Sequence, residues 1–283
     1  MGMHRSLIST QALEEQLGSP DIVVLDASLH LPAANRDPRA EYEAKHIPGA
    51  LYLDVKTLVD TGSSVPQALP NPAQLADRLA ALGVHARQRI VLYDDSALRS
   101  SARAWFMLAV HGVGSVAILD GGFAKWQAEG RPTDALGSDT KPTEPAALAA
   151  PNRVRDKEEM LINLETRAEQ VLDARAADRV YGTGIDPVHG GQNGRIPGSL
   201  NLPFGQVFNS DGTFKSAEAI RSAFADAGID LTQPIVTTCG SGITASVLLF
   251  ALHLIGIDDA ALYDGSWMEW EADPDTPKAQ GPE

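Results

Sequence analysis

The sequence predicts an α/β protein of two similar domains, each with a mainly parallel β-sheet and helices on both faces. Two observations predict it: the chain repeats itself, and short β-branched segments alternate with helical patterns. At a shift of 144 residues and without a gap, Val91–Asp95 aligns with Ile235–Cys239, and Trp126 aligns with Trp270. A length of 283 residues also fits two domains of about 140 residues each.

The expected elements follow from hydrophobic periodicity and residue type. Strands are expected at 21–26, 89–93, 115–119, 235–238 and 260–263, and helices at 72–82, 100–111, 217–227 and 244–255. We place the first domain at 1–140, a proline- and alanine-rich linker at 141–151, and the second domain at 152–283. The tail after Asp273, which is rich in proline and charge, is expected to be loose.

Composition and charge exclude several classes of function. The net charge of −14 would repel phosphate backbones and anionic lipids, so no nucleic-acid partner and no membrane partner is expected. No run of 18 apolar residues is available to span a bilayer, and the N-terminus lacks the apolar core of a signal peptide. A single cysteine excludes an internal disulfide and a cysteine-cluster metal site. We therefore expect a cytoplasmic protein without a bound metal.

The single cysteine opens a glycine-rich turn between a strand and a helix. The run Cys239-Gly240-Ser241-Gly242-Ile243-Thr244 follows the apolar stretch Ile235–Thr238 and precedes an apolar helical pattern. Two glycines let the chain fold around the sulfur, so that several N–H groups point inward at Sγ. The positive end of a helix that begins near Thr244 would favour a thiolate over a thiol. This pattern favours a nucleophile, although a lone cysteine commonly serves only as a packing residue.

The corresponding turn of the first half lacks these features. Asp95 takes the place of the cysteine, and Ser96-Ala97-Leu98-Arg99 follows it without a glycine. Such a loop cannot wrap a sulfur atom or act as a nucleophile. We therefore expect the first domain to lack the catalytic cysteine and to serve as a structural partner.

The chain resembles the tandem-domain rhodanese sulfurtransferases over roughly residues 7–270. The resemblance lies in the cysteine loop, the duplicated domains, the turns Ile47-Pro48-Gly49 and Ile196-Pro197-Gly198, and the paired Asp-Gly-x-x-x-x-Trp endings. It implies a Cys239 persulfide that carries sulfur to a thiol acceptor, such as thioredoxin or a small thiol, or to cyanide. No cofactor is implied, because the chemistry is an exchange between sulfurs.

The identity of the sulfur donor stays open at this point. Cys-Gly-Ser-Gly followed by Ile or Val and Thr is typical of 3-mercaptopyruvate sulfurtransferases, whereas enzymes that prefer thiosulfate usually carry Arg and Lys after the cysteine. An uncharged loop should favour the monocarboxylate over the dianion. A thiosulfate sulfurtransferase and a non-catalytic sulfur-binding module are the alternatives. A cysteine phosphatase is disfavoured, because Ala245 stands where it needs an arginine.

The resemblance also implies an arginine that binds the substrate carboxylate, and Arg179 is its candidate. The alternative for Arg179 is an ion pair with Asp178 or Asp186, and Arg175 is expected to pair internally. A second family arginine is replaced here by Val188, which is followed by His189. Lys56 and Gln67 stand where the family tends to place an Asp and a His that pair with the loop serine. Whether His189, Lys56 or Gln67 reaches the site is left open by the sequence.

Overall fold

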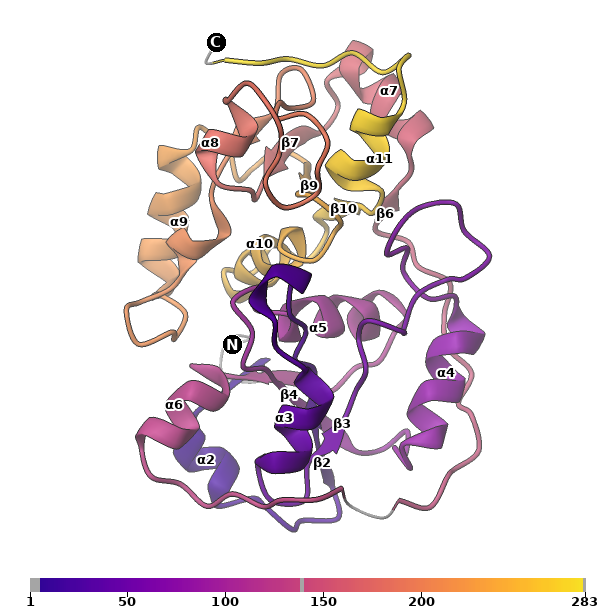
Figure 1. Ribbon diagram of the computed structural model, residues 1–283, viewed down its shortest axis with the longest axis vertical. Helices are drawn as coiled ribbons and strands as arrows, with labels where there is room; N and C mark the ends of the chain where they lie inside the picture. Colours follow the sequence, from indigo (N-terminus) through magenta and orange to yellow (C-terminus); the bar gives the residue numbers. More distant parts are fainter. Residues whose placement is uncertain (1–5, 138–139, 282–283) are drawn as a thin grey trace. The chain divides into compact units, whose positions relative to one another are not determined.

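The computed structural model describes residues 6–137 and 140–281 of the chain, which form two compact units (Figure 1). The first unit comprises Met1–Asp60, Leu69–Pro151 and Asn209–Phe214. The second unit comprises Thr61–Ala68, Asn152–Phe208 and Lys215–Glu283. Two short segments therefore group with the half of the chain to which they do not belong in sequence. The stretch 141–151 is part of the first unit, where Thr143 and Ala149 donate backbone hydrogen bonds to Ala80 and His111.

Each unit contains a five-stranded sheet in which all pairs of strands are parallel, which confirms the predicted fold class. The first sheet has the order β1-β5-β4-β2-β3, with β1 Leu7–Ile8, β2 Ile22–Asp26, β3 Leu51–Tyr52, β4 Arg89–Tyr93 and β5 Val116–Leu119. The second has the order β6-β10-β9-β7-β8, with β6 Val154–Arg155, β7 Gln170–Asp173, β8 Leu200–Asn201, β9 Ile235–Thr238 and β10 Ala261–Tyr263.

The helices follow the same order in both units. The first unit has α2 Thr10–Glu14, α3 Pro38–Ala44, α4 Pro72–Ala81, α5 Ser101–Val110 and α6 Gly122–Ala128. The second has α7 Lys157–Thr166, α8 Ala177–Val180, α9 Ala217–Asp226, α10 Ala245–Leu254 and α11 Ser266–Ala272. Two short 3-10 helices, η1 Pro32–Ala34 and η2 Phe204–Val207, complete the described elements. Every strand and helix that the periodicity predicted is present, with each boundary within one residue of its expected place.

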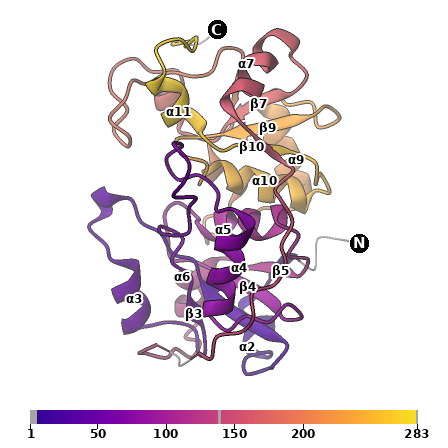
Figure 2. The ribbon, with the colours of Figure 1, turned by 90° about the vertical axis from the view of Figure 1, so that its right-hand side faces the viewer.

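The strands β9 and β10 of the second sheet are buried along their whole length, as expected for strands that are covered on both faces. On one face, Val236 and Ala261 pack with Met160 of α7 and with Trp267 and Trp270 of α11. Alternate residues of a strand point to opposite faces, and α10 contacts β9 and β10 (Figure 2). All but one residue of α10 are buried, so this helix is a central core element.

Residues 274–281 of the tail are anchored to the second unit, so the expectation of a loose end was wrong for this part of the tail. Ala279 and Arg195 exchange two backbone hydrogen bonds of 2.9 and 3.0 Å. Trp270 donates from Nε1 to the carbonyl of Pro277 at 2.8 Å, and Thr276 is buried. Proline and charge exclude a regular helix or strand here, but they do not exclude anchoring by side chains of the core.

A buried carboxyl group in the first unit makes stability depend on pH. Burial raises the pKa of Asp26 to about 6, although hydrogen bonds from Ser28 act in the opposite direction. Because the folded-state pKa lies above the ordinary value, this group stabilises the fold least when it is ionised. Its unfavourable contribution grows as the pH rises from about 4 to about 6 and stays constant above that.

We predict that Asp26→Asn increases the free energy of unfolding at about pH 8 by up to about 3 kcal/mol and changes it little at about pH 4. The amide keeps the size of the carboxyl group and removes the charge. Urea denaturation of both proteins across this pH range measures the difference. An equal effect of the substitution at both ends of the range would contradict the assignment.

Candidate active site

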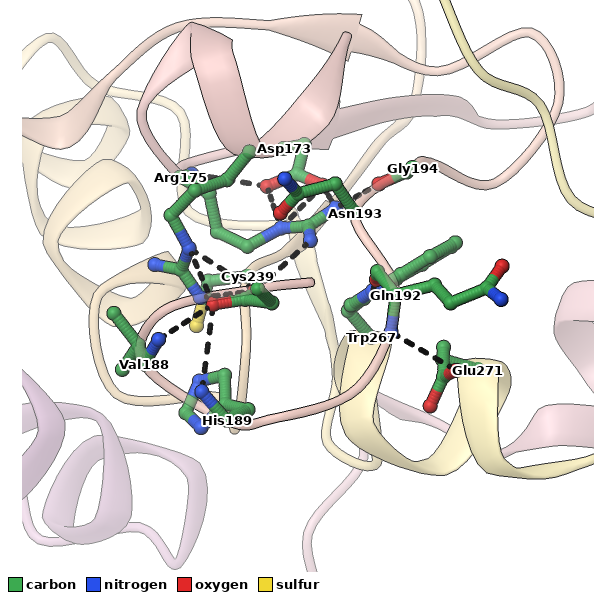
Figure 3. Close-up of polar contacts among 12 residues, drawn as sticks. Asp173, Arg175, Val188, His189, Gln192, Asn193, Gly194, Cys239, Trp267 and Glu271 are labelled. Carbon is green, nitrogen blue, oxygen red and sulfur yellow. Dashed lines mark hydrogen bonds and ion pairs between the residues drawn. The ribbon is translucent and has the colours of Figure 1, made fainter. Parts of the chain in front are cut away.

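Cys239 lies at the carboxyl end of β9, where the chain turns into α10 (Figure 3). Gly242 has a φ of 78°, in the left-handed region that a side chain disfavours. The hydroxyl of Ser246, in the first turn of α10, donates to the carbonyl of Gly242 at 2.8 Å. The second glycine of the motif is therefore required by the backbone path, and the turn is tied to the helix that follows it.

The main chain of the cysteine is held by the start of α11. The N–H of Cys239 donates to Oγ of Ser266 at 3.2 Å, and its carbonyl accepts from the N–H of Trp267 at 3.0 Å. Met268 donates in the same way to the carbonyl of Gly240 at 3.0 Å. Sequence reasoning missed Ser266, whose φ of 51° is unusual for a serine and is a feature that no sequence pattern announces.

The loop after the cysteine has buried N–H groups without acceptors. Among residues 6–137 and 140–281, no hydrogen bond is donated by the N–H groups of five loop residues, Gly240, Ser241, Ile243, Thr244 and Ala245. All five residues are buried. Buried N–H groups are nearly always paired in proteins, so a cluster of unpaired ones indicates a place prepared for an anion. The N-terminus of α10 adds its partial positive charge to the same place.

The first unit pairs three of the five equivalent N–H groups internally, those of Ser96, Arg99 and Ser101. Asp94 accepts hydrogen bonds from the N–H groups of Ser96 and Ser101, both at 2.9 Å, and Ser96 accepts from Leu98 at 3.1 Å. At the shift of 144 residues Asp94 corresponds to Thr238, whose Oγ1 is buried and has no partner in the described structure. The carboxylate of Asp94 thus accepts from N–H groups of the first loop, whereas the hydroxyl of Thr238 accepts from none in the second loop.

The thiol of Cys239 is buried, with an exposed fraction of only 2%. Its surroundings are polar, because the unpaired N–H groups adjoin it in sequence and the imidazole of His189 lies against Gly240. A Cβ atom built on Gly240 would stand 1.9 Å from Nε2 of His189, so no other residue fits at position 240 without moving the ring. The first glycine of the motif therefore makes room for His189.

Arg175 has a structural role. It is fully buried, donates to Asp173 and to the carbonyl of Gly194 at 2.7 and 2.6 Å, and stacks on the ring of Trp267 at 4.8 Å. Its internal pairing agrees with the expectation from the sequence.

Arg179 pairs with Asp186, as the alternative to substrate binding foresaw. Its Nε lies 3.0 and 3.1 Å from the two carboxylate oxygens of Asp186, and its Nη2 lies 2.7 Å from one of them. Burial raises the pKa of Asp186, but hydrogen bonds from Arg179 and from the N–H of Val188 outweigh burial and hold it below the ordinary value. Among residues 6–137 and 140–281, no acceptor lies on the guanidinium edge formed by Nη1 and Nη2, and this edge can receive a second carboxylate.

The three remaining candidates, His189, Gln67 and Lys56, belong to different parts of the chain. His189 belongs to the same loop as Asp186, which accepts from its N–H at 3.4 Å, and it reaches the cysteine loop (Figure 3). Gln67 lies in the segment Thr61–Ala68 of the second unit, with a φ of 61°. Lys56 is exposed and belongs to the first unit. Within the described ranges, no group of three potential metal ligands is present, and no helix is long and apolar enough to cross a membrane.

Comparison with known proteins identifies the family. The Rhodanese-like domain matches residues 9–129 and again residues 156–273. The chain is 41% identical to 3-mercaptopyruvate sulfurtransferase of Mus musculus over 95% of its length and 92% of the relative, and 38% identical to thiosulfate sulfurtransferase of Cricetulus griseus over 99% and 97%. The crystal structure of SseA, a 3-mercaptopyruvate sulfotransferase of Escherichia coli, matches with a TM-score of 0.84 and 33% identity, covering 92% of this chain and 98% of that one. The chain therefore belongs to the rhodanese family and is a tandem-domain sulfurtransferase.

Proposed function

We propose that the enzyme takes sulfur from 3-mercaptopyruvate, holds it as a persulfide on Cys239, and delivers it to a thiol such as thioredoxin or a small thiol, or to cyanide. The observation that carries this proposal is the set of five buried and unpaired N–H groups that directly follow the cysteine. Such groups stabilise negative charge on a sulfur atom as an oxyanion hole does on oxygen.

The reaction balances without a cofactor. The thiolate of Cys239 attacks the sulfur of the donor, and an S–S bond forms as the C–S bond breaks. The electron pair of the C–S bond forms the enolate of pyruvate, which takes up the proton of the donor thiol. The outer sulfur is left with a negative charge among the loop N–H groups. Attack by the acceptor on that sulfur breaks the S–S bond and returns the thiolate.

The free edge of Arg179 supports the choice of a carboxylate donor. Asp186 fixes the guanidinium from one side through three contacts of 2.7 to 3.1 Å, so the arginine is oriented before a ligand arrives. A planar fork of this kind binds a carboxylate through two parallel hydrogen bonds. Pairing with Asp186 and binding of substrate are therefore compatible roles for one residue.

The charge of the cysteine loop favours the same donor. Residues 240–244 carry no charged side chain, so a dianion such as thiosulfate meets only N–H dipoles there. A monocarboxylate needs less compensation and places its charge away from the reacting sulfur. Thiosulfate is the second candidate donor, which the similarity to thiosulfate sulfurtransferases supports.

We predict that Cys239→Ser abolishes sulfur transfer from both donors and leaves the fold intact, because the hydroxyl cannot carry a persulfide. Pyruvate release from 3-mercaptopyruvate with cyanide as the acceptor measures the effect, and circular dichroism checks the fold. Turnover by the serine variant at the wild-type rate would end the proposal.

We predict that Thr238→Asp strongly lowers turnover, because a carboxylate at this position takes up loop N–H groups as Asp94 does in the first unit. Thr238→Val is the matched control. It removes a hydroxyl that has no partner among the described residues and should keep most of the activity. Equal losses in the two variants would show that the loop N–H groups are not the cause.

We predict that Arg179→Ala lowers kcat/KM for 3-mercaptopyruvate by on the order of ten- to a hundredfold, the loss of a charged hydrogen-bonded pair. Arg87→Ala, a change at an exposed arginine of the first unit, should have no effect. Steady-state kinetics of both variants, with unfolding curves to check stability, make the comparison. An unchanged kcat/KM in Arg179→Ala would place the carboxylate elsewhere.

A further inference from the structure

His189 is held in place against the cysteine loop from both sides. Its ring occupies the space beside Gly240 that a side chain would otherwise fill, with Nε2 only 1.9 Å from the position of a Cβ atom. Its main chain is fixed by Asp186, whose side chain accepts from the N–H of His189 and whose carbonyl accepts from Gly190 at 2.9 Å. The imidazole therefore belongs to the immediate surroundings of the cysteine loop.

Two ion pairs and one further carboxylate make up the fixed charges near this ring. Arg175 pairs with Asp173, and Arg179 pairs with Asp186. On α11, Glu271 faces the same segment and accepts from the N–H of Gln192 at 3.1 Å. The loop 240–244 contributes no charge. Among these groups, His189 is the one whose ordinary titration range lies near neutral pH, so its protonation changes the net charge beside Cys239.

The neutral form of this imidazole is favoured at neutral pH. Burial lowers the pKa of His189, the positive charge of Arg179 lowers it further, and the negative charge of Asp186 opposes both. The group therefore stays uncharged at neutral pH and gains a charge in mildly acidic solution.

We propose that His189 selects the sulfur donor: as a neutral ring beside Gly240 it keeps the loop suited to a monoanion, and as a cation it favours a dianion. This inference rests on the proposed function of Cys239. The attraction between a new positive charge and a ligand scales with the charge of the ligand, so thiosulfate gains more than 3-mercaptopyruvate does. Any effect of the cation on the thiolate of Cys239 is common to both donors and cancels in their ratio.

The test is the ratio of kcat/KM for thiosulfate to kcat/KM for 3-mercaptopyruvate, measured from about pH 5.5 to about pH 8. For the wild type we expect this ratio to rise on the order of tenfold toward the acidic end. In His189→Gln the rise should disappear, apart from any part that belongs to the donors themselves. In His189→Lys the ratio should be high throughout. His85→Gln, at an exposed histidine, is the matched control and should behave as the wild type.

A readout independent of turnover accompanies the kinetics. The imidazole signal of His189, assigned in NMR spectra by its absence from His189→Gln, should titrate with the same midpoint as the ratio. A His189→Gln ratio that follows the wild-type profile, or a midpoint that differs from the imidazole titration, would overturn the inference. If the wild type transfers sulfur from neither donor, the proposed function itself fails; transfer from both donors with an unchanged ratio defeats only the role of His189.

Discussion

The unpaired N–H groups after Cys239 are the constraint on which the active site depends. A buried turn whose five donors find no acceptor in the described part of the chain is unfavourable, because each buried N–H group loses its hydrogen bond to water. The turn is kept in shape by its surroundings: Ser266 and Trp267 hold the main chain of Cys239, and α10 holds Gly242. A negatively charged sulfur on Cys239 then supplies the hydrogen-bond acceptor that these N–H groups lack in the free enzyme.

The two units show how one fold can keep or lose this property. The central strands β4 and β9 end within one residue of equivalent positions, and in both units the chain then turns into a buried helix, α5 or α10. In the first unit Asp94 accepts hydrogen bonds from two of the loop N–H groups, those of Ser96 and Ser101. In the second unit Thr238 does not, and the donors stay available. The replacement of Asp94 by Thr238 and of Asp95 by Cys239, together with the two glycines of the second loop, thus accompanies the difference between a structural and a reactive loop.

The sequence patterns predicted the architecture more completely than they predicted the contacts among charged side chains. The repeat and its apolar periods predicted β9 and α10 to within one residue, and the glycines predicted the turn around Cys239. The pairing of Arg179 with Asp186 was predicted only as the alternative to binding of a substrate carboxylate. A sequence does not show that one guanidinium group can hold two carboxylates, one on each edge. The position of His189 over Gly240 and the anchoring of the tail by Trp270 depend on loop paths that no period encodes.

The binding of the charged sulfur by the loop N–H groups is tested most directly by amide NMR spectra of the loop before and after sulfur is loaded on Cys239. We predict downfield shifts for the amide protons of Gly240, Ser241, Ile243, Thr244 and Ala245 as they donate to the charged sulfur, and unchanged shifts for the amide protons of the loop after Asp95. Persulfide formation without such shifts would contradict the central role of these donors.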